Sequence, residues 1–549
     1  MDEITAAIYF QADAYSTDTD ALMGRHAAGE SFINAYFRYT KSPTLYAQVN
    51  QFENAKQFEK LARTQGVNKP IKAILPDQYG ALAEAQTLYY PGPDIDQLAF
   101  LRSAVNPNGW SICGITHTTS SARVMDAIAK WITAPVQPWD AIICTSVAVK
   151  RHVETILRSE ISRLNERLGV TQFPLPQLPV IPLGVSTRDF VFSDLEKQRA
   201  RRSLAIDAEA MVVLYVGRLS FHAKAHPMAM YQALEIASRR TGQEIVLVEA
   251  GWFANDYTQV AFRTAQQACC PSVKVISVDG RDSEQRKNSW AAADVFCSLS
   301  DNIQETFGIT PVEAMAAGLP VVVSDWDGYK DSVTEEVGFK IPTFLPQPGL
   351  GTDLAFRHAS GVDNYDYYCG HVCTFVSVDV GKCAEAFTKL FQDASLRHRM
   401  GAAARTRAEE NYDWAVIMPK YEALWAHLYH LRSQHATIGP QLWPARLDPF
   451  AAFSHYSTNT LTVNSTVYRL DEDVDRALSR LSRLYDLEMV KFAHQVIPNK
   501  ELLRGLLLKI PITPTLVQDV IDEFDDGHFA IRLRALSVLS KLGVIGLAE

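Results

Sequence analysis

Short apolar runs that alternate with amphipathic stretches are the feature that most constrains how this chain folds. Such runs are typical of parallel strands buried on both faces, and the stretches between them are typical of helices that cover the sheet. A loop with Gly24 and Gly29 is expected to precede a helix over 31–39, and a longer helix is expected over 147–168. In this first part of the chain we predict strands at Ala6–Phe10, Ile71–Leu75, Trp110–Thr116, Ala141–Thr145 and Leu178–Ile181.

The same alternation restarts near residue 185. After a basic helix that ends near Arg202, we predict a second series of strands at Met211–Gly217, Glu244–Ala250, Val273–Val278, Val295–Leu299 and Pro320–Ser324. Two successive α/β halves imply two Rossmann-like domains facing a cleft, where ligands of such sheets bind. We place these domains at 1–190 and 191–411, followed by a crossover helix at 412–438 and an accessory domain at 439–549.

Two regions depart from this alternation. Residues 341–380 are rich in proline, glycine and tyrosine, which predicts an insertion or a long loop. Beyond residue 439 the pattern is mainly helical, with helices expected near 471–485, 500–509, 515–524 and 530–542. The last two, joined by Asp525-Asp526-Gly527, are similar to a winged-helix pair. This region has no strong basic excess, so packing, homo-oligomer formation or recognition of an acceptor protein is favoured over DNA binding.

The composition favours a soluble protein. Hydrophobic residues make up 47% and charged residues 21% of the chain, and the net charge of -9 argues against nonspecific nucleic-acid binding. The scattered cysteines suit a reducing compartment. No basic stretch precedes an apolar run at the start, so we expect a cytoplasmic protein. The basic residues of 147–168 leave two alternatives open, a solvated face and a peripheral contact with an anionic membrane.

The segment from Asp301 to Pro320 carries the strongest functional signal. A strand is expected to end near residue 300, and a helix is expected to begin at Thr310 with Pro311 in its first position. Gly308 permits close approach of the backbone, and the free amides at a helix start favour an anion such as the distal phosphate of a nucleoside diphosphate.

Glu305 and Glu313 stand on either side of this predicted helix start. They can therefore face different parts of one ligand, such as two sets of sugar hydroxyls. Thr310 and Glu313 also fit a capping box, in which the glutamate bonds only a backbone amide. Both interpretations of Glu313 stay open at this point.

Arg218 and Lys224 follow the first predicted strand of the second half. The carboxyl end of such a strand is where ligands of parallel sheets bind. Arginine grips two oxygens with its planar fork, and lysine supplies a compact charge, so the pair suits a pyrophosphate. A pair of ordinary surface charges is the alternative.

Together these segments resemble the retaining family-4 glycosyltransferases (glycosyltransferase group 1) of the GT-B superfamily, from about Ala6 to Leu431. The resemblance rests on Gly217-Arg218-Leu219 with Lys224, on the Glu-x7-Glu element Glu305 to Glu313, and on 314–322. It is supported by 324–329, by 338–342, and by 412–414 ahead of a helix that in this family returns to the first domain.

The resemblance implies a role for each matched residue. Arg218 and Lys224 would bind the diphosphate of the donor, Glu305 the transferred sugar and Glu313 the ribose. His117 would be the active-site histidine that orients donor sugar or acceptor, with a packed histidine as the alternative. Further donor contacts are implied for Gly29, Gly217, Phe307, Gly308, Ile309 and Thr310.

The implied activity is transfer of a sugar from a nucleoside diphosphate sugar to an acceptor hydroxyl, with retention and with no metal or other cofactor required. Asp325-Trp326-Asp327 has the form of a DxD metal motif, but that motif belongs to a different transferase fold, and we interpret it as an ordinary loop. Ala225 and 251–254 depart from the glycines of the family. The nucleobase pocket near 278–281 is therefore not assigned from the sequence.

Other classes remain as alternatives. A GT-B epimerase or a phosphorylase acts on related ligands, although no motif for a pyridoxal-binding lysine is present. A non-catalytic protein that binds sugar nucleotides is a further alternative. A dinucleotide-binding enzyme is disfavoured, because no Gly-x-Gly-x-x-Gly follows a candidate strand.

Overall fold

The computed structural model describes residues 5–15, 24–522 and 529–548. The chain divides into two compact units at Trp443 and Pro444, and each is described by itself. Among the helices of the described residues, none combines the length and the apolar character needed to cross a bilayer. The eight cysteines are all free thiols.

The larger unit begins with a six-stranded parallel sheet in the order β3-β2-β1-β4-β5-β6. Its strands are β1 Ala7–Tyr9, β2 Leu45–Gln48, β3 Ile71–Ile74, β4 Thr87–Tyr89, β5 Ser111–Ile115 and β6 Ala141–Ile143. The helices of this domain are α1 Gly24–Tyr39, α2 Phe52–Thr64, α3 Leu82–Ala85, α4 Asp96–Val105, α5 Ala122–Lys130 and α6 Val147–Leu168.

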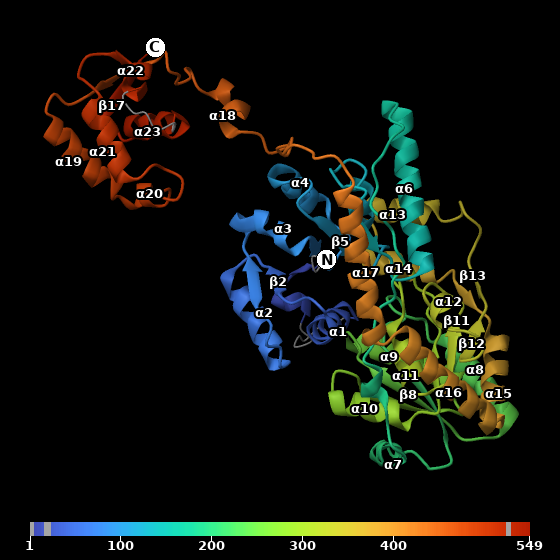
Figure 1. The fold of residues 1–549 in the computed structure, drawn as a ribbon. Helices are drawn as coiled ribbons and strands as arrows, with labels where there is room; N and C mark the ends of the chain where they lie inside the picture. Colours follow the sequence, from blue (N-terminus) through green and yellow to red (C-terminus); the bar gives the residue numbers. More distant parts are fainter. Residues whose placement is uncertain (1–4, 16–23, 523–528, 549) are drawn as a thin grey trace. The chain divides into compact units, whose positions relative to one another are not determined.

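A second six-stranded parallel sheet follows, in the order β12-β11-β10-β7-β8-β9 (Figure 1). Its strands are β7 Met211–Val216, β8 Ile245–Gly251, β9 Lys274–Asp279, β10 Val295–Ser298, β11 Val321–Ser324 and β12 Gly338–Ile341. Its helices are α7 Asp194–Ser203, α8 Met228–Thr241, α9 Asp256–Cys269, α10 Ser283–Ala292, α11 Ile309–Ala316, α12 Tyr329–Ser332, α15 Val380–Gln392 and α16 Ala394–Asn411.

Both sheets have the doubly wound Rossmann order, in which the first and fourth strands of each domain are neighbours at the centre. Ligands of such sheets bind at the carboxyl ends of these two strands, where the winding direction changes. In the second domain these strands are β7 and β10, which pair in parallel. The two predicted Rossmann-like domains are therefore confirmed.

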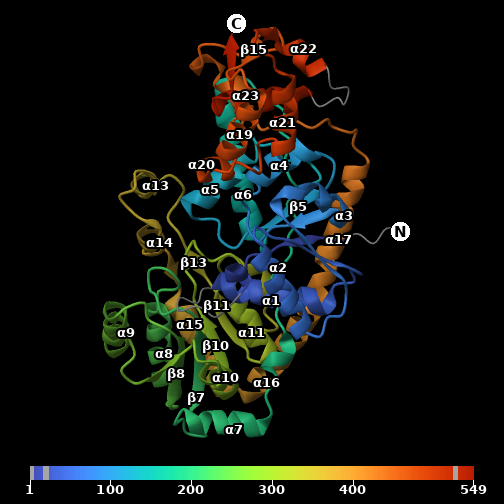
Figure 2. The same cartoon turned by 90° about the vertical axis from the view of Figure 1, so that its left-hand side faces the viewer.

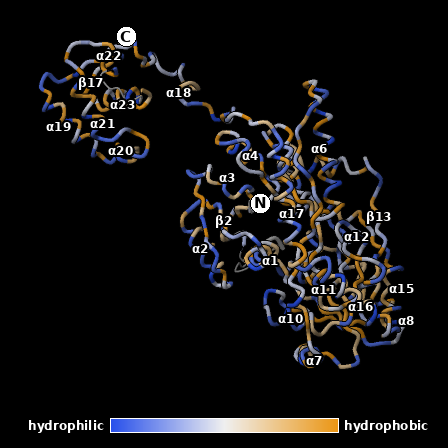
Figure 3. Tube along the Cα trace, in the orientation of Figure 1, coloured by the Kyte–Doolittle hydropathy of each residue, from blue (hydrophilic) through white to orange (hydrophobic). Residues whose placement is uncertain are grey.

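Burial on both faces explains why the central strands form where the sequence is continuously apolar. All residues of β7 are buried: Val212 and Leu214 pack in one core, and Val213 and Tyr215 pack in the core on the opposite face. Removal of such side chains from water stabilises a fold by roughly 25 cal/mol per Å². In Figure 3 the segment around α11 is largely apolar, whereas α2 is mainly hydrophilic.

Helix α17, Trp414–Ser433, returns from the second domain to the first, as the resemblance implied. Its buried Trp414, Tyr421 and Trp425 belong to the core of the first domain, and the helix lies beside α1 (Figures 1 and 2). The two connections between the domains run together, because Val185 N–H donates to the Tyr412 carbonyl (2.8 Å) and Trp414 N–H to the Val185 carbonyl (3.1 Å).

The predicted insertion has structure of its own. A two-stranded antiparallel ladder of β13, Thr343–Phe344, and β14, Ser377–Val378, closes its base. Between these strands lie α13, Thr352–Ala359, and α14, Tyr365–Cys373.

The smaller unit is mainly helical, as predicted, and also contains a three-stranded antiparallel sheet in the order β16-β15-β17. Its elements are β15 Thr466–Arg469, α19 Val474–Tyr485, α20 Glu488–Lys491, α21 Lys500–Lys509, β16 Thr515–Leu516, α22 Val517–Asp522, α23 Phe529–Lys541 and β17 Ile545–Ala548. The predicted helix over 515–524 is wrong at its start, where β16 lies. Residues 523–528, with the Asp-Asp-Gly loop, lie outside the described residues. The first part of this unit contains the short helix α18 Pro449–Ala452 and a 3-10 turn at Ser454–Tyr456.

Two predictions for the first domain are wrong. Leu178–Ile181 is not a strand: 177–181 makes only isolated bridges to residues of the β6 region, since the prolines around it cannot donate ladder hydrogen bonds. Gly24 and Gly29 do not form a loop, because α1 begins at Gly24 and includes Gly29. Packing of Ala28 and Phe32 in this helix outweighs the ~1 kcal/mol that a helical glycine costs.

Candidate functional site

The two motifs of the second domain meet at the carboxyl ends of β7 and β10. Lys224 Nζ donates to Glu305 Oε2 at 2.6 Å. Arg218 Nη2 donates to Gln304 Oε1 at 2.9 Å and to the Ala223 carbonyl at 3.2 Å. The structure thus brings both cations and the first glutamate together at the position where ligands of a doubly wound sheet bind.

The ion pair is largely shielded from water. The side chain of Lys224 is 25% exposed and that of Glu305 is 10% exposed. Burial by itself would raise the pKa of Glu305, but the charge and hydrogen bond of Lys224 outweigh it and hold that pKa below its usual value. Glu305 is therefore an anion at neutral pH, and the two charges compensate each other in a poorly solvated place.

The helix start beside them differs by one residue from the prediction. Helix α11 begins at Ile309, and Gly308 is the residue before it, with φ of +78°. A Cβ on Gly308 would lie 1.8 Å from Cε1 of the buried Tyr329. Because Thr310 is already inside the helix, it is not the N-cap, and the capping box of Thr310 and Glu313 does not form. Gly308 has no side chain to cap the helix, and the first amides of α11 have no partner within the helix.

Glu313 lies half-buried on α11, where burial raises its pKa to about 7 and the charge of Arg286 opposes this only in part. A carboxylate that carries a desolvation penalty gains from hydrogen-bond donors, such as ligand hydroxyls. Its predicted contact with a ribose stays a prediction.

Replacing Glu313 with glutamine is expected to change stability in a pH-dependent way. The folded-state pKa is raised, so this group stabilises the fold fully below its usual pKa of 4.5, and the contribution is lost as the pH rises through about 7. Glu313→Gln should therefore be more stable than the wild type at pH 8 by about 1–3 kcal/mol and nearly equal to it at pH 4. Urea unfolding at both pH values measures the difference, with the exposed Glu335→Gln as control. Equal effects at the two pH values would contradict the assignment.

The first domain contacts the same loop from the other side. Thr306 Oγ1 donates to the His117 carbonyl at 3.1 Å, and Thr145 Oγ1 donates to the Thr306 carbonyl at 3.4 Å. Ser146 Oγ donates to Asp327 Oδ1 at 2.9 Å. His117 follows β5 as predicted, and its backbone lies directly beside the Glu305 loop.

His117 and Gly29 both line a small cavity in the first domain. Its other lining residues are mostly aromatic and apolar: Tyr15, Ala28, Phe32, Tyr89, Pro91, Ile115, Leu183, Trp414 and Tyr421. The predicted donor contact of Gly29 and the predicted role of the His117 ring stay predictions.

The ends of β7, β8 and β9 approach closely through their glycines. Gly217 N–H donates to the Ala250 carbonyl at 3.1 Å, and Gly280 N–H donates to the Gly251 carbonyl at 2.9 Å. Arg281 lies over the Trp252 ring, 5.9 Å from its centroid. These residues occupy the region that the sequence left unassigned, on the β9 side of Arg218.

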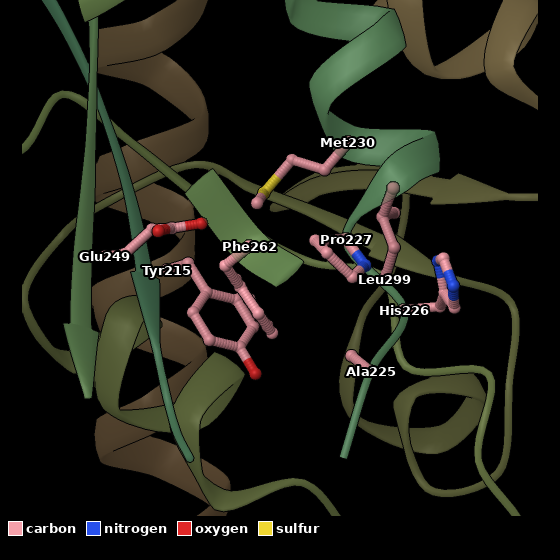
Figure 4. A pocket seen from close by; sticks show the side chains of 8 residues that line it. All are labelled: Tyr215, Ala225, His226, Pro227, Met230, Glu249, Phe262 and Leu299. Carbon is pink, nitrogen blue, oxygen red and sulfur yellow. The ribbon is translucent and has the colours of Figure 1, made fainter. Parts of the chain in front are cut away.

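A second small cavity lies behind the 217–226 loop (Figure 4). It is lined by Tyr215, Ala225, His226, Pro227, Met230, Glu249, Phe262 and Leu299. Both oxygens of its one carboxylate, Glu249, accept internal hydrogen bonds, from Tyr231 (2.5 Å) and Gln266 (2.8 Å). The rest of the lining is mainly apolar, so this cavity does not suit a phosphate.

The DxD-like segment has its two carboxylates engaged separately. Asp325 pairs with Lys330 at 3.0 Å, whereas Asp327 accepts from Ser146 of the first domain. Within the described ranges, no group of three or more histidine, cysteine, aspartate or glutamate side chains is arranged to hold a metal ion.

Several residues at this site were missed by sequence reasoning. Gln304 and Thr306 lie beside Glu305 within the recognised segment, but their partners belong to distant parts of the chain. In the sequence, Ser146 is recognisable only as the residue before a predicted helix. Contacts between residues that are far apart in the chain leave no local pattern in the sequence.

Comparison with known proteins agrees with this geometry. Residues 196–347 match the family described as glycosyl transferases group 1. This part of the chain is similar to that family. The matched residues include Arg218, Lys224, Glu305 and Glu313.

Individual relatives match over part of their length. D-inositol 3-phosphate glycosyltransferase of Corynebacterium efficiens is 26% identical over 43% of this chain and 47% of its own. Phosphatidyl-myo-inositol mannosyltransferase of Mycobacterium leprae is 30% identical over 25% of this chain and 27% of its own. The chain spans about half the length, or less, of these curated relatives. Anabaena HepE, solved in complex with UDP, has the same fold: the TM-score is 0.50 at 15% identity, with 77% of this chain and 100% of that chain covered.

Proposed function

We propose that this protein is a retaining glycosyltransferase that moves a sugar from a nucleoside diphosphate sugar to an acceptor hydroxyl. One observation carries the proposal: Arg218, Lys224 and Glu305 converge beside the start of α11, at the ends of β7 and β10. This arrangement combines two cations and free helix amides with an acid that is suited to sugar hydroxyls.

The chemistry follows from where charge develops. As the bond between the anomeric carbon and the phosphate oxygen breaks, negative charge collects on the leaving diphosphate. Lys224, Arg218 and the first amides of α11 stabilise that charge, and they act most strongly in the transition state. The acceptor oxygen then bonds the anomeric carbon, and its proton passes to an oxygen of the departing diphosphate.

Lys224 and Glu305 pair with each other before a donor binds, and each of them has a different partner once the donor is bound. The diphosphate competes for the lysine, and the sugar hydroxyls replace the lysine as donors to the carboxylate. Because both groups are already charged and shielded, little reorganisation is needed when a donor enters.

The names of the relatives suggest which donors and acceptors to test first. Several matched relatives are named for transfer to inositol-containing acceptors, and HepE was crystallised with UDP. We therefore take UDP sugars as the first donors and inositol phosphate as the first acceptor. We propose that no metal is needed, since the two cations neutralise the departing diphosphate.

The proposal is tested by incubation with a panel of nucleoside diphosphate sugars, with and without acceptors, and by detection of free nucleoside diphosphate. We expect release that depends on acceptor and that persists in EDTA. A changed sugar nucleotide without release indicates an epimerase. Tight binding of a donor without any product indicates a non-catalytic binding protein.

A further inference from the structure

A buried anion joins the two helices of the 341–380 insertion to each other. Asp363 is 4% exposed and accepts two hydrogen bonds from the Arg357 guanidinium, at 2.7 and 2.8 Å. His371 Nδ1 lies 2.9 Å from the same carboxylate. A bidentate arginine pair is strong and directional, and Asp363 thus connects Arg357 of α13 to His371 of α14.

Helix α14 packs against the loop that carries Arg218 and Lys224. Cys373 Sγ lies 3.7 Å from the Phe221 carbonyl. A Cβ on Gly370 would lie 2.9 Å from Cβ of His222, so the helix approaches this loop as closely as a glycine permits. The insertion is thus part of the wall around the diphosphate loop.

Tyr365, the first residue of α14, reaches across to the first domain. Its phenol oxygen lies 3.1 Å from Thr118 Oγ1 and 2.9 Å from Ser120 Oγ. Burial raises the pKa of Tyr365, and hydrogen bonds from Ser120, Thr118 and Gln304 oppose this. A phenol can donate one proton and accept at two lone pairs, so it can serve all three partners at once.

Gln304 lies between the Tyr365 phenol and the Arg218 guanidinium. Its Oε1 accepts from Arg218 Nη2 at 2.9 Å, and its side chain lies near enough to the Tyr365 phenol to lower the pKa of that phenol. An amide that lies between the guanidinium and the phenol restricts the direction in which the guanidinium points.

We infer that Tyr365 is a positioning residue: it ties the 117–120 loop of the first domain to the second domain and, through Gln304, orients Arg218 for the donor diphosphate. This role rests on the proposed function. It gives the insertion a part in the reaction, because the insertion completes the Arg218 side of the cleft and contacts the first domain through Thr118 and Ser120.

The matched pair Tyr365→Phe and Tyr367→Phe tests this role. Tyr367 lies on the same helix and is 63% exposed. Loss of the phenol hydroxyl at 365 should lower kcat for nucleoside diphosphate release about five- to tenfold, as expected for a lost hydrogen-bond network. The KM for the donor should change less than about twofold, and the variant at 367 should behave as the wild type. Combining Tyr365→Phe with Gln304→Leu should add little to either loss, because both act through Arg218.

A second readout needs no turnover. Amide hydrogen exchange of the 117–121 segment should be faster in Tyr365→Phe and in Ser120→Ala, and unchanged in Tyr367→Phe. If the wild type releases no nucleoside diphosphate from any donor, the proposed function fails, and exchange alone still decides whether Tyr365 ties the domains. Wild-type exchange in Tyr365→Phe, or kinetic losses that add fully with those of Gln304→Leu, would overturn the inference.

Discussion

Replacing Lys224 with alanine is expected to lower the rate of nucleoside diphosphate release by about 10²- to 10³-fold, the cost of removing one group that stabilises transition-state charge. Lys224 contacts Glu305 and faces the position that we assign to the diphosphate. Because the charge that it stabilises develops during bond breaking, kcat should fall more than the affinity for the donor. Steady-state kinetics with the best donor of the panel measures both.

Lys224→Ala also leaves the shielded Glu305 carboxylate without its partner, and this lowers the stability of the protein independently of catalysis. The double variant Lys224→Ala/Glu305→Gln removes that orphaned charge, so it should regain stability without regaining turnover. Lys287→Ala, at an exposed lysine paired with Glu196, is the matched control and should retain wild-type turnover. Near-normal turnover in Lys224→Ala would remove the lysine from the mechanism.

Replacing Gly308 with alanine is expected to destabilise the second domain by about 2–4 kcal/mol and to abolish detectable release of nucleoside diphosphate. The added methyl would meet the Tyr329 ring at 1.8 Å, and the backbone would stay at a φ of +78° that alanine rarely adopts. Tyr329 is fully buried and bonds Ser298, so the start of α11 must move instead. Chemical unfolding and the release assay measure the two effects.

Gly242→Ala is the matched control for backbone strain. Gly242 has φ of +67°, and no atom lies within 4 Å of its added Cβ, so only the strain of about 1–2 kcal/mol remains and turnover should persist. If the two glycine variants lose equal stability and both keep turnover, close packing at Gly308 does not shape the site.

The sequence predicts the fold well where strands are continuously apolar, as in β7 and β8. It misses β2 and β4, because these strands have only four and three residues and each has a polar residue at one end, Gln48 and Thr87, which leaves a very short apolar run. The order of strands in each sheet depends on long-range pairing and is visible only in the structure.

The sequence predicts only those parts of the site that follow from the positions of the strands. Arg218, Lys224 and Glu305 each follow a recognisable strand, so their approach was foreseeable from the way parallel strands end. Gln304 and Tyr365 owe their positions to contacts between elements far apart in the chain. The start of α11 is capped by a glycine and not by a capping box. The sequence could not decide between these arrangements, because Thr310 and Glu313 fit both.

The most direct test of the account is a crystal structure of the protein with bound UDP. We predict that the distal phosphate lies within hydrogen-bond distance of Arg218, Lys224 and the first amides of α11, with Glu313 at the ribose. A diphosphate bound elsewhere, with Lys224 and Arg218 turned away from it, would contradict the central claim.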